Sequence, residues 1–225
     1  RQTHAPPGPN APRNTVLYTL LSRVKRPTSG SVHFKGDRIN ALPSPRIAAR
    51  GIGRTFQIVK PFASLTVLEN VLVARGITRY GTFRRLWGPW RSRSETRAAT
   101  EILERVGLED LAKRKAGLLP LGDLRRLEIA RALVVGRQLI LLDESFSGLR
   151  HEEISQLETL IRRIRDDGIT VLLIEHNMRV TMGLCDRIVV LDHGRKIAQG
   201  EPKAIQENDQ VIEAYLGSRG GRHAA

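Results

Sequence analysis

The sequence of 225 residues is poor in cysteine and in aromatic side chains, and it has no long apolar run. The single cysteine, Cys185, cannot form an intramolecular disulfide, which excludes the small disulfide-stabilised domains of secreted proteins. No apolar stretch approaches the roughly 20 residues of a membrane-spanning helix, and no signal peptide is visible after Arg1. With 40% hydrophobic and 27% charged residues, the composition predicts a globular, cytosolic protein that buries a substantial core.

Acidic residues are scarce in the first 97 positions, which contain 3 Asp and Glu against 18 Lys and Arg. The remaining residues hold 20 acidic against 19 basic residues, so nearly all of the net charge of +14 lies in the first part of the chain. This asymmetry predicts a basic surface that meets an anionic partner, either nucleic acid or lipid headgroups. A solvated basic face without a partner is the alternative.

Two apolar runs end in charged residues at equivalent points. Residues 139–142 lead into Asp143 and Glu144, and residues 169–174 lead into Glu175 and His176. Helical spacing of apolar residues over 152–165 predicts a βαβ unit with parallel strands, whose carboxyl ends share one edge of a sheet. Carboxylates and a histidine at that edge favour metal coordination and proton handling on a phosphate. The alternative is that these polar residues only end the strands.

Helices, turns and one hairpin are predicted elsewhere in the chain. Apolar spacing and a terminating Gly107 predict a helix over 95–106, and residues 187–191 and 196–198 predict an edge hairpin. Residues 119–133 predict an amphipathic helix with Gly122 and Asp123 at its N-cap, where backbone N–H groups favour an anion. A capped helix without a ligand explains the same pattern.

Taken together, these motifs resemble the ATPases of ABC transporters. The runs ending at Asp143–Glu144 and at His176 resemble that family's Walker B strand and switch histidine. Residues 147–149 resemble its D-loop, residues 121–127 its signature segment, and residues 54–57 its Q-loop. The phrases at residues 53–57, 65–71, 182–188 and 211–217 resemble the ATP-binding subunit of branched-chain amino acid importers. The resemblance covers about residues 15–217.

The resemblance implies an α/β fold, a P-loop NTPase-like ABC ATPase domain with a parallel core sheet and a helical signature subdomain. It places this domain at 15–217, the helical subdomain at about 70–136 and a disordered tail at 218–225. Residues 1–14 are predicted to be an irregular segment with a degenerate P-loop. The family's first strands and the aromatic residue that stacks on adenine would precede Gly8, so these strands are predicted to be missing.

The resemblance also implies ATP and Mg²⁺ as cofactors. Asp143, Gln57 and Thr15 would hold Mg²⁺, Glu144 would polarise the attacking water, and His176 would contact the γ-phosphate, with Gln57 sensing the site. The expected nucleotide-binding residues of the P-loop are Gly8, Pro9, Asn10, Asn14, Thr15 and Val16. Gly122, Asp123 and Gly148 would meet the nucleotide of a second subunit.

The implied partners are a second ATPase subunit, identical or different, and two membrane permease subunits, with an extracytoplasmic solute-binding protein acting indirectly. The chain would then lie peripherally on the cytoplasmic face of the inner membrane. Residues 57–97, which include Arg84 and Arg85, would face the permease. Nucleic acid is a weaker alternative suggested only by charge, because no recognition helix or aromatic-basic platform is found.

The phosphate-binding loop departs from the family pattern G-x-x-x-x-G-K-[ST]. Arg13 stands at the second glycine, Asn14 stands at the lysine, and Pro12 removes a backbone N–H from the loop. Ser145, Arg150 and His151 also replace the family's common residues, which affects contacts across the subunit boundary. These departures predict weak ATP binding, and they keep open a second interpretation as a catalytically impaired or truncated scaffold subunit of the same fold.

Overall fold

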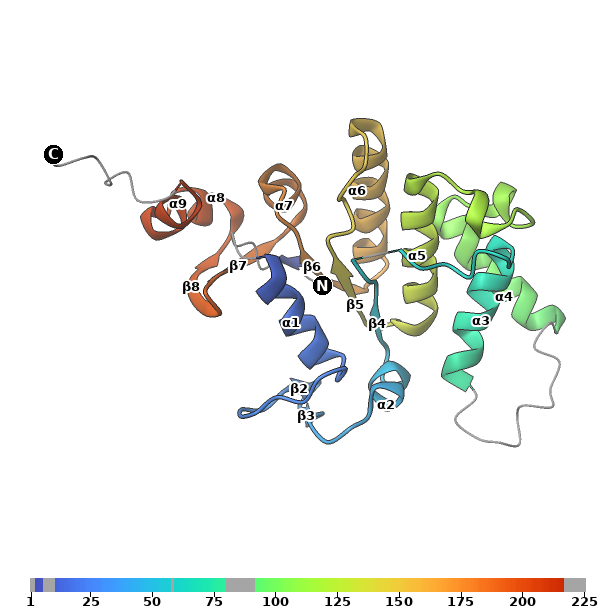
Figure 1. Ribbon diagram of the computed structural model, residues 1–225, viewed down its shortest axis with the longest axis horizontal. Coiled ribbons are helices and arrows are strands. Elements are labelled where there is room, and N and C mark those ends of the chain that lie inside the picture. The colour runs from blue at the N-terminus through green and yellow to red at the C-terminus, as the bar shows by residue number, and fades with distance from the viewer. Residues whose placement is uncertain (1–2, 6–10, 58, 80–91, 217–225) are drawn as a thin grey trace, which may run out of the picture.

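A computed structural model describes residues 3–5, 11–57, 59–79 and 92–216 of the chain. A six-stranded sheet runs through it in the order β4-β5-β6-β1-β7-β8 (Figure 1). All neighbouring strands are parallel except the β7–β8 pair. The strands are β1 (Thr3–Ala5), β4 (Ile52–Arg54), β5 (Leu139–Asp143), β6 (Thr170–Ile174), β7 (Arg187–Asp192) and β8 (Arg195–Gly200).

The two central strands β5 and β6 are buried on both faces because they are apolar except for Asp143 at the end of β5 and Thr170 at the start of β6. Ile140 and Leu142 of β5 belong to the larger core cluster, whereas Leu141 between them belongs to the smaller one. Side chains alternate between the two faces of a strand, so an uninterrupted apolar run supplies both cores. The prediction of a parallel βαβ unit over this region is confirmed.

Different elements cover the two faces, as Figure 1 shows. The smaller core contains Tyr18, Ile39 and Ile47, from or near α1 (Ala11–Leu21), the hairpin of β2 (His33–Phe34) and β3 (Asp37–Arg38), and α2 (Ser44–Ala49). The larger core is formed with α6 (His151–Asp166) and α7 (Met178–Leu184), and it continues into the helical layer.

The helical layer beyond β4 contains α3 (Val67–Arg79), α4 (Arg93–Val106) and α5 (Leu121–Val135), with short 3₁₀ turns at Glu109–Leu111 and Ala116–Leu118. Helix α4 ends at Gly107, which has φ of 66° and accepts the left-handed conformation that ends helices. The predicted helix and its stop are therefore confirmed. Helix α5 packs against β4 so closely that a Cβ on Gly53 would lie 2.2 Å from the carbonyl oxygen of Ala132.

The N-terminal prediction is partly wrong. The sequence predicted an irregular segment over 1–14 and missing N-terminal strands, yet β1 lies between β6 and β7 and α1 already begins at Ala11. Hydrogen bonds to two neighbouring strands hold a three-residue strand that local sequence does not mark. Pro12 is tolerated because the first N–H groups of a helix have no partner within it.

The start of α5 also differs from the prediction. Pro120 is the N-cap, and Gly122 and Asp123 lie inside the first turn. A proline at the N-cap supplies no side-chain hydrogen bond, and its fixed φ suits a chain entering a helix.

The C-terminal part follows the predicted hairpin. His193 and Gly194, both with positive φ, connect β7 to β8. Two helices, α8 (Pro202–Gln206) and α9 (Asp209–Leu216), follow. Over the described residues, no helix combines the length and the apolarity needed to cross a membrane.

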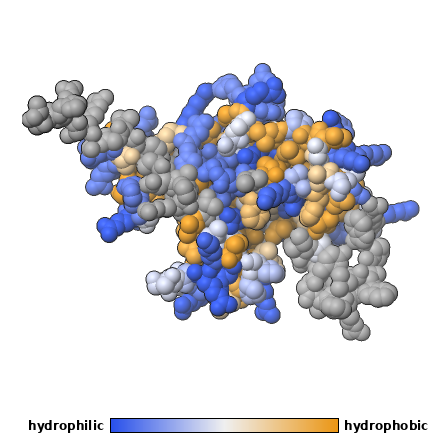
Figure 2. Space-filling model, in the orientation of Figure 1, coloured by the Kyte–Doolittle hydropathy of each residue, from blue (hydrophilic) through white to orange (hydrophobic). Residues whose placement is uncertain are grey.

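Hydrophilic side chains dominate the rim of the face drawn in Figure 2, with hydrophobic side chains between them over the helical layer. The large apolar side chains that remain exposed include Phe56, Phe62, Leu118 and Leu121. Phe62 stacks under the guanidinium of Arg131 from α5, 5.1 Å from the ring centre.

Candidate active site

Three polar side chains meet where β4, β5 and β6 end. Nε2 of Gln57 donates to Oε2 of Glu144 at 2.7 Å, and Nε2 of His176 lies 3.1 Å from Oε1 of the same carboxylate. Because the three strands are parallel, the residues that follow them emerge at one edge of the sheet. The prediction that Glu144 and His176 converge at this edge is confirmed.

Glu144 has an unusual backbone conformation, with φ of 48°. Non-glycine residues seldom adopt positive φ, and such strained positions cluster at functional sites. The N–H of Glu144 donates to the carbonyl of Ile174 at 2.9 Å, which fixes the turn against β6. The strained turn directs the carboxylate toward Gln57 and His176.

Asp143, the last residue of β5, is fully buried and paired with a cation. Nη2 of Arg54 donates to Oδ2 of Asp143 at 3.2 Å, and Nη1 donates to Oγ of Ser22 at 2.9 Å. The Arg54 side chain is 9% exposed, and its guanidinium lies over the rings of Tyr18 and Phe56. This buried carboxylate therefore has a positive charge beside it on the side of α1.

Glu175 is a second buried carboxylate beside the cluster, with 4% of its surface exposed. Burial raises the pKa of Glu175 to about 7, although its Oε1 accepts the N–H of Phe146 at 3.0 Å, which acts in the opposite direction. The nearby Glu144 carboxylate raises the pKa further. Glu175 therefore changes charge near neutral pH while it holds the turn that follows Glu144.

A second group of predicted residues lies at the start of α5. Asp123 is ion-paired with Arg126, and a Cβ on Gly148, whose φ is 79°, would lie 3.1 Å from Leu121. A Cβ on Gly122 would lie only 2.6 Å from a carboxylate oxygen of Glu153 on α6. The backbone N–H of Arg150 is the main cause that lowers the pKa of Glu153, and the N–H of Gly122 contributes as well.

Gly122, Asp123 and Glu153 border a cavity of about 180 Å³ between the starts of α5 and α6. Within one chain, the structure thus assembles two groups. One contains Gln57, Asp143, Glu144 and His176, and the other contains Gly122, Asp123 and Gly148.

The predicted P-loop residues are only partly described. Gly8, Pro9 and Asn10 lie outside the described residues. Asn14 and Thr15 belong to the first turns of α1, and their side chains are also outside the described part of the chain. Val16, the next residue of α1, is 42% exposed. The nucleotide and metal roles expected for these six residues stay predictions.

The donor set at the sheet edge fits a phosphate that arrives with a divalent cation. Asp143, Glu144 and Gln57 offer carboxylate and amide oxygens, the ligand type that Mg²⁺ prefers, and Arg54 shows that the Asp143 carboxylate already has a cation beside it. Among the described residues, no three His, Cys, Asp or Glu side chains form a metal site by themselves. Mg²⁺ in nucleotide sites usually takes its other ligands from phosphate oxygens and water.

Sequence reasoning did not single out several buried polar residues around this edge. Arg54 was noted only as part of a phrase, and Arg125 and Glu128 of α5 were not identified, although both are buried. A usable signal existed, because Arg125 and Glu128 are three residues apart on a helix whose other buried residues are apolar. Charged residues at such positions need a partner inside the fold.

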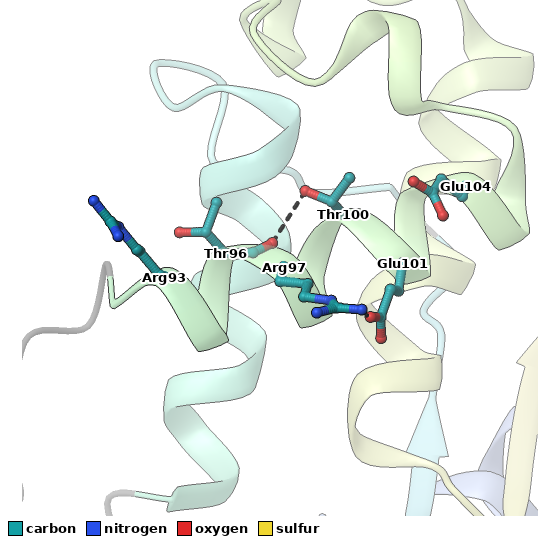
Figure 3. A pocket seen from close by; sticks show the side chains of 6 residues that line it. All are labelled: Arg93, Thr96, Arg97, Thr100, Glu101 and Glu104. Atoms are coloured by element: carbon teal, nitrogen blue, oxygen red, sulfur yellow. Dashed lines mark hydrogen bonds and ion pairs between the residues drawn. The ribbon is translucent and has the colours of Figure 1, made fainter.

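Another groove lies elsewhere, along the outer surface of α4. Figure 3 shows its side chains, with Arg97 paired to Glu101 at 3.2 Å and Thr100 bonded to the backbone of Thr96. Its volume is about 540 Å³. Arg97 and Glu101 are 84% and 58% exposed. Open, solvated charges of this kind are ordinary helix surface, so the groove adds nothing to the site.

Comparison with known proteins gives consistent matches. The family model described as ABC transporter matches residues 7–147, and the model described as branched-chain amino acid ATP-binding cassette transporter matches residues 195–220. The chain is 40% identical to the high-affinity branched-chain amino acid transport ATP-binding protein LivG of Escherichia coli K12, covering 93% of this chain and 85% of LivG. It is 38% identical to the corresponding protein BraF of Pseudomonas aeruginosa, with the same coverage.

Among solved structures, MJ1267 in its ADP conformation, an ATP-binding cassette of an ABC transporter, superposes with a TM-score of 0.84 at 29% identity. The match covers 96% of this chain and 88% of that one. A nucleotide-free ATP-binding cassette from an ABC transporter gives a TM-score of 0.80 at 28% identity.

Proposed function

This chain belongs to the ABC transporter ATP-binding family, and from that premise we propose that it couples ATP binding and hydrolysis to the import of branched-chain amino acids. The observation that carries the proposal is the grouping of Gln57, Glu144 and His176 within hydrogen-bond distance beside the buried Asp143. The likeness to LivG and BraF supports the solute class, because both are named as branched-chain amino acid transport proteins.

The arrangement of Glu144 suits the activation of a water molecule. When ATP is bound with Mg²⁺, the cofactor supplies the phosphoryl group that is transferred and much of the charge stabilisation that the transfer needs. Glu144 is held on two sides by Gln57 and His176, so its carboxylate is oriented before any substrate arrives. Its role is to accept a proton from water. Gln57 and His176 orient that carboxylate and offer hydrogen-bond donors to a phosphate.

The cation requirement follows from the charges at the sheet edge. Asp143 and Glu144 are neighbours, and Arg54 is the cation that the structure pairs with Asp143. A bare phosphate would meet carboxylates, so binding depends on a divalent cation that joins the carboxylate and phosphate oxygens. Asp143, Gln57 and Thr15 are the residues that we assign to this cation, and Gly122, Asp123 and Gly148 to the nucleotide of the second subunit.

The phosphate-binding loop favours one alternative, a subunit that binds ATP weakly and acts mainly as a scaffold. Asn14 lacks the charge of the family's lysine, and a hydrogen bond to a charged group is worth roughly 1.5–3 kcal/mol, or about ten- to hundredfold in affinity. Calorimetric titration with Mg-ATP distinguishes a working ATPase from a scaffold subunit. Micromolar affinity in the unmodified chain supports a working ATPase, whereas no measurable heat supports the scaffold.

We further propose that the chain assembles with a second ATPase subunit and with permease subunits on the cytoplasmic face of the membrane. The cationic region 57–97 is the proposed permease-facing surface, of which residues 80–91, including Arg84 and Arg85, lie outside the described residues. The test measures binding of the purified chain to detergent-solubilised permease and, separately, to random duplex DNA at physiological salt. At that salt concentration, Coulombic attraction between exposed charges is largely screened beyond about 8 Å. Capture by the permease supports the assignment, and salt-resistant binding to DNA alone contradicts it.

A further inference from the structure

One buried ion pair on α5 is not accounted for by the proposed function. Nη1 of Arg125 lies 3.5 Å from Oε2 of Glu128, and the two residues are 5% and 7% exposed. A buried pair of this kind contributes little net stability, because removing two charges from water costs about as much as their attraction returns. Its other hydrogen bonds are therefore the better guide to its role.

The guanidinium of Arg125 contacts the backbone of two loops. Nη1 donates to the carbonyl of Gln57 at 3.2 Å, and Nη2 donates to the carbonyl of Ser147 at 3.4 Å. Gln57 is the residue whose side chain contacts Glu144, and Ser147 lies three residues after Glu144. The single guanidinium of Arg125 thus bonds the segment that contains Gln57 and the segment that follows Glu144.

Glu128 holds the same segment from the other side. Its Oε1 accepts the N–H of Phe56 at 2.9 Å, so the peptide group before Phe56 and the carbonyl of Gln57 are both bonded to α5. Phe56 itself is 56% exposed, and its side chain contributes little burial to hold the segment in place. The position of Gln57 therefore depends on the two charged residues of α5.

We propose that Arg125 and Glu128 are positioning residues that hold Gln57 on Glu144 and make the segment at Ser147 move together with α5. This inference deepens the proposed function, on which it rests. Gly122 and Asp123 lie in the first turn of α5, about one helical turn before Arg125. A ligand or subunit that displaces the start of α5 would displace Gln57 and Ser147 at the same time.

Hydrogen exchange of backbone amides in the full chain without nucleotide tests whether Arg125 and Glu128 hold the two segments to α5. Arg125→Lys keeps the charge but not the planar fork, so it cannot bond both carbonyls as arginine does. We expect exchange to be about tenfold faster in two segments together, residues 54–57 and 144–149, as for the loss of hydrogen bonds to a charged group. Glu128→Gln replaces the charged acceptor of the Phe56 N–H with a weaker neutral one, so it should speed exchange mainly in residues 54–57.

Arg162→Lys is the control, because Arg162 of α6 also donates to a backbone carbonyl, that of Gly183 in α7, and contacts neither segment. It should leave both segments unchanged. The proposal is overturned if Arg125→Lys leaves either segment unchanged, or if exchange rises uniformly along the chain, since a uniform rise would show only a loss of global stability.

Steady-state ATP hydrolysis tests the link to the reaction. Because Arg125 acts through Gln57, we expect Arg125→Lys to lower kcat about tenfold and to change the KM for Mg-ATP less than twofold. A rise in KM with unchanged kcat would overturn the proposal. If the unmodified chain hydrolyses no ATP, the proposed function fails, while the exchange experiment still decides whether α5 positions the two segments.

Discussion

Removal of the Arg54 guanidinium should lower the stability of the fold, because it breaks the ion pair with the buried Asp143 carboxylate. Asp143 has no exposed surface, and Arg54 is the cation that the structure pairs with it, at 3.2 Å. Breaking a buried ion pair by removing one partner costs about 3–5 kcal/mol, because the remaining buried charge loses the compensation of that pair. For a chain of this size, about 2–4 °C of melting temperature corresponds to each kcal/mol. Arg54→Met should therefore lower the melting temperature by about 6–20 °C.

The double variant Arg54→Met with Asp143→Asn isolates the cause of that loss. Asp143→Asn removes the buried charge and keeps the shape of that side chain, so the double variant should recover at least half of the lost stability in urea unfolding and calorimetry. Arg50→Met is the control, because the Arg50–Asp37 pair is 38% and 66% exposed and should be worth less than about 1 kcal/mol. A single variant within about 1 kcal/mol of the parent, or a double variant as unstable as the single one, would refute the reasoning.

Three further predictions concern pH, packing and nucleotide binding. The pKa of Glu175 is about 7 in the folded chain, above its value near 4.5 in the unfolded chain. The protonated Glu175 side chain therefore contributes to folding stability below pH 4.5, and this contribution is lost as the pH rises through 7. Glu175→Gln should therefore remove about 3 kcal/mol of pH dependence from urea unfolding between pH 4.5 and 8. Gly53→Ala should lower stability by about 3 kcal/mol or more because its Cβ would meet backbone at 2.2 Å, whereas Gly183→Ala, with only a side-chain atom at 4.0 Å, should be nearly neutral in the same assay. Asn14→Lys combined with Arg13→Gly should raise Mg-ATP affinity about ten- to hundredfold in calorimetry, and an unchanged affinity would contradict the assigned loop.

The central part of the site was predictable from local sequence. Two apolar runs, each followed by charged residues, specify parallel strands that end at one edge, and this placed Glu144 and His176 together. The pattern suffices because a strand buried on both faces is apolar along its length, so the first charged residue marks the end of the apolar run and of the strand. Gly107 ended α4 for a similarly local reason, its positive φ.

Other features depended on contacts between distant segments. Thr3–Ala5 form a strand only because β6 and β7 offer hydrogen bonds on both sides, and the sequence there, with its prolines, predicted an irregular segment. The cation beside Asp143 comes from Arg54, 89 positions away in the sequence. Side-chain partners at such separations are determined by how strands and helices pack, so local sequence patterns do not predict them.

The sequence by itself determined the strand–helix order, the polar strand ends and the departures at Arg13 and Asn14, because each depends only on residue types and on short spacings along the chain. Only the tertiary structure decided that the carboxylate of Glu144 is held by Gln57 and His176, and that Arg125 of α5 ties Gln57 to Ser147. These contacts depend on distances of about 3 Å between groups on four separate segments. Such distances are fixed by the packing of the sheet against α5, since hydrogen bonds form only when the donor and acceptor reach that separation.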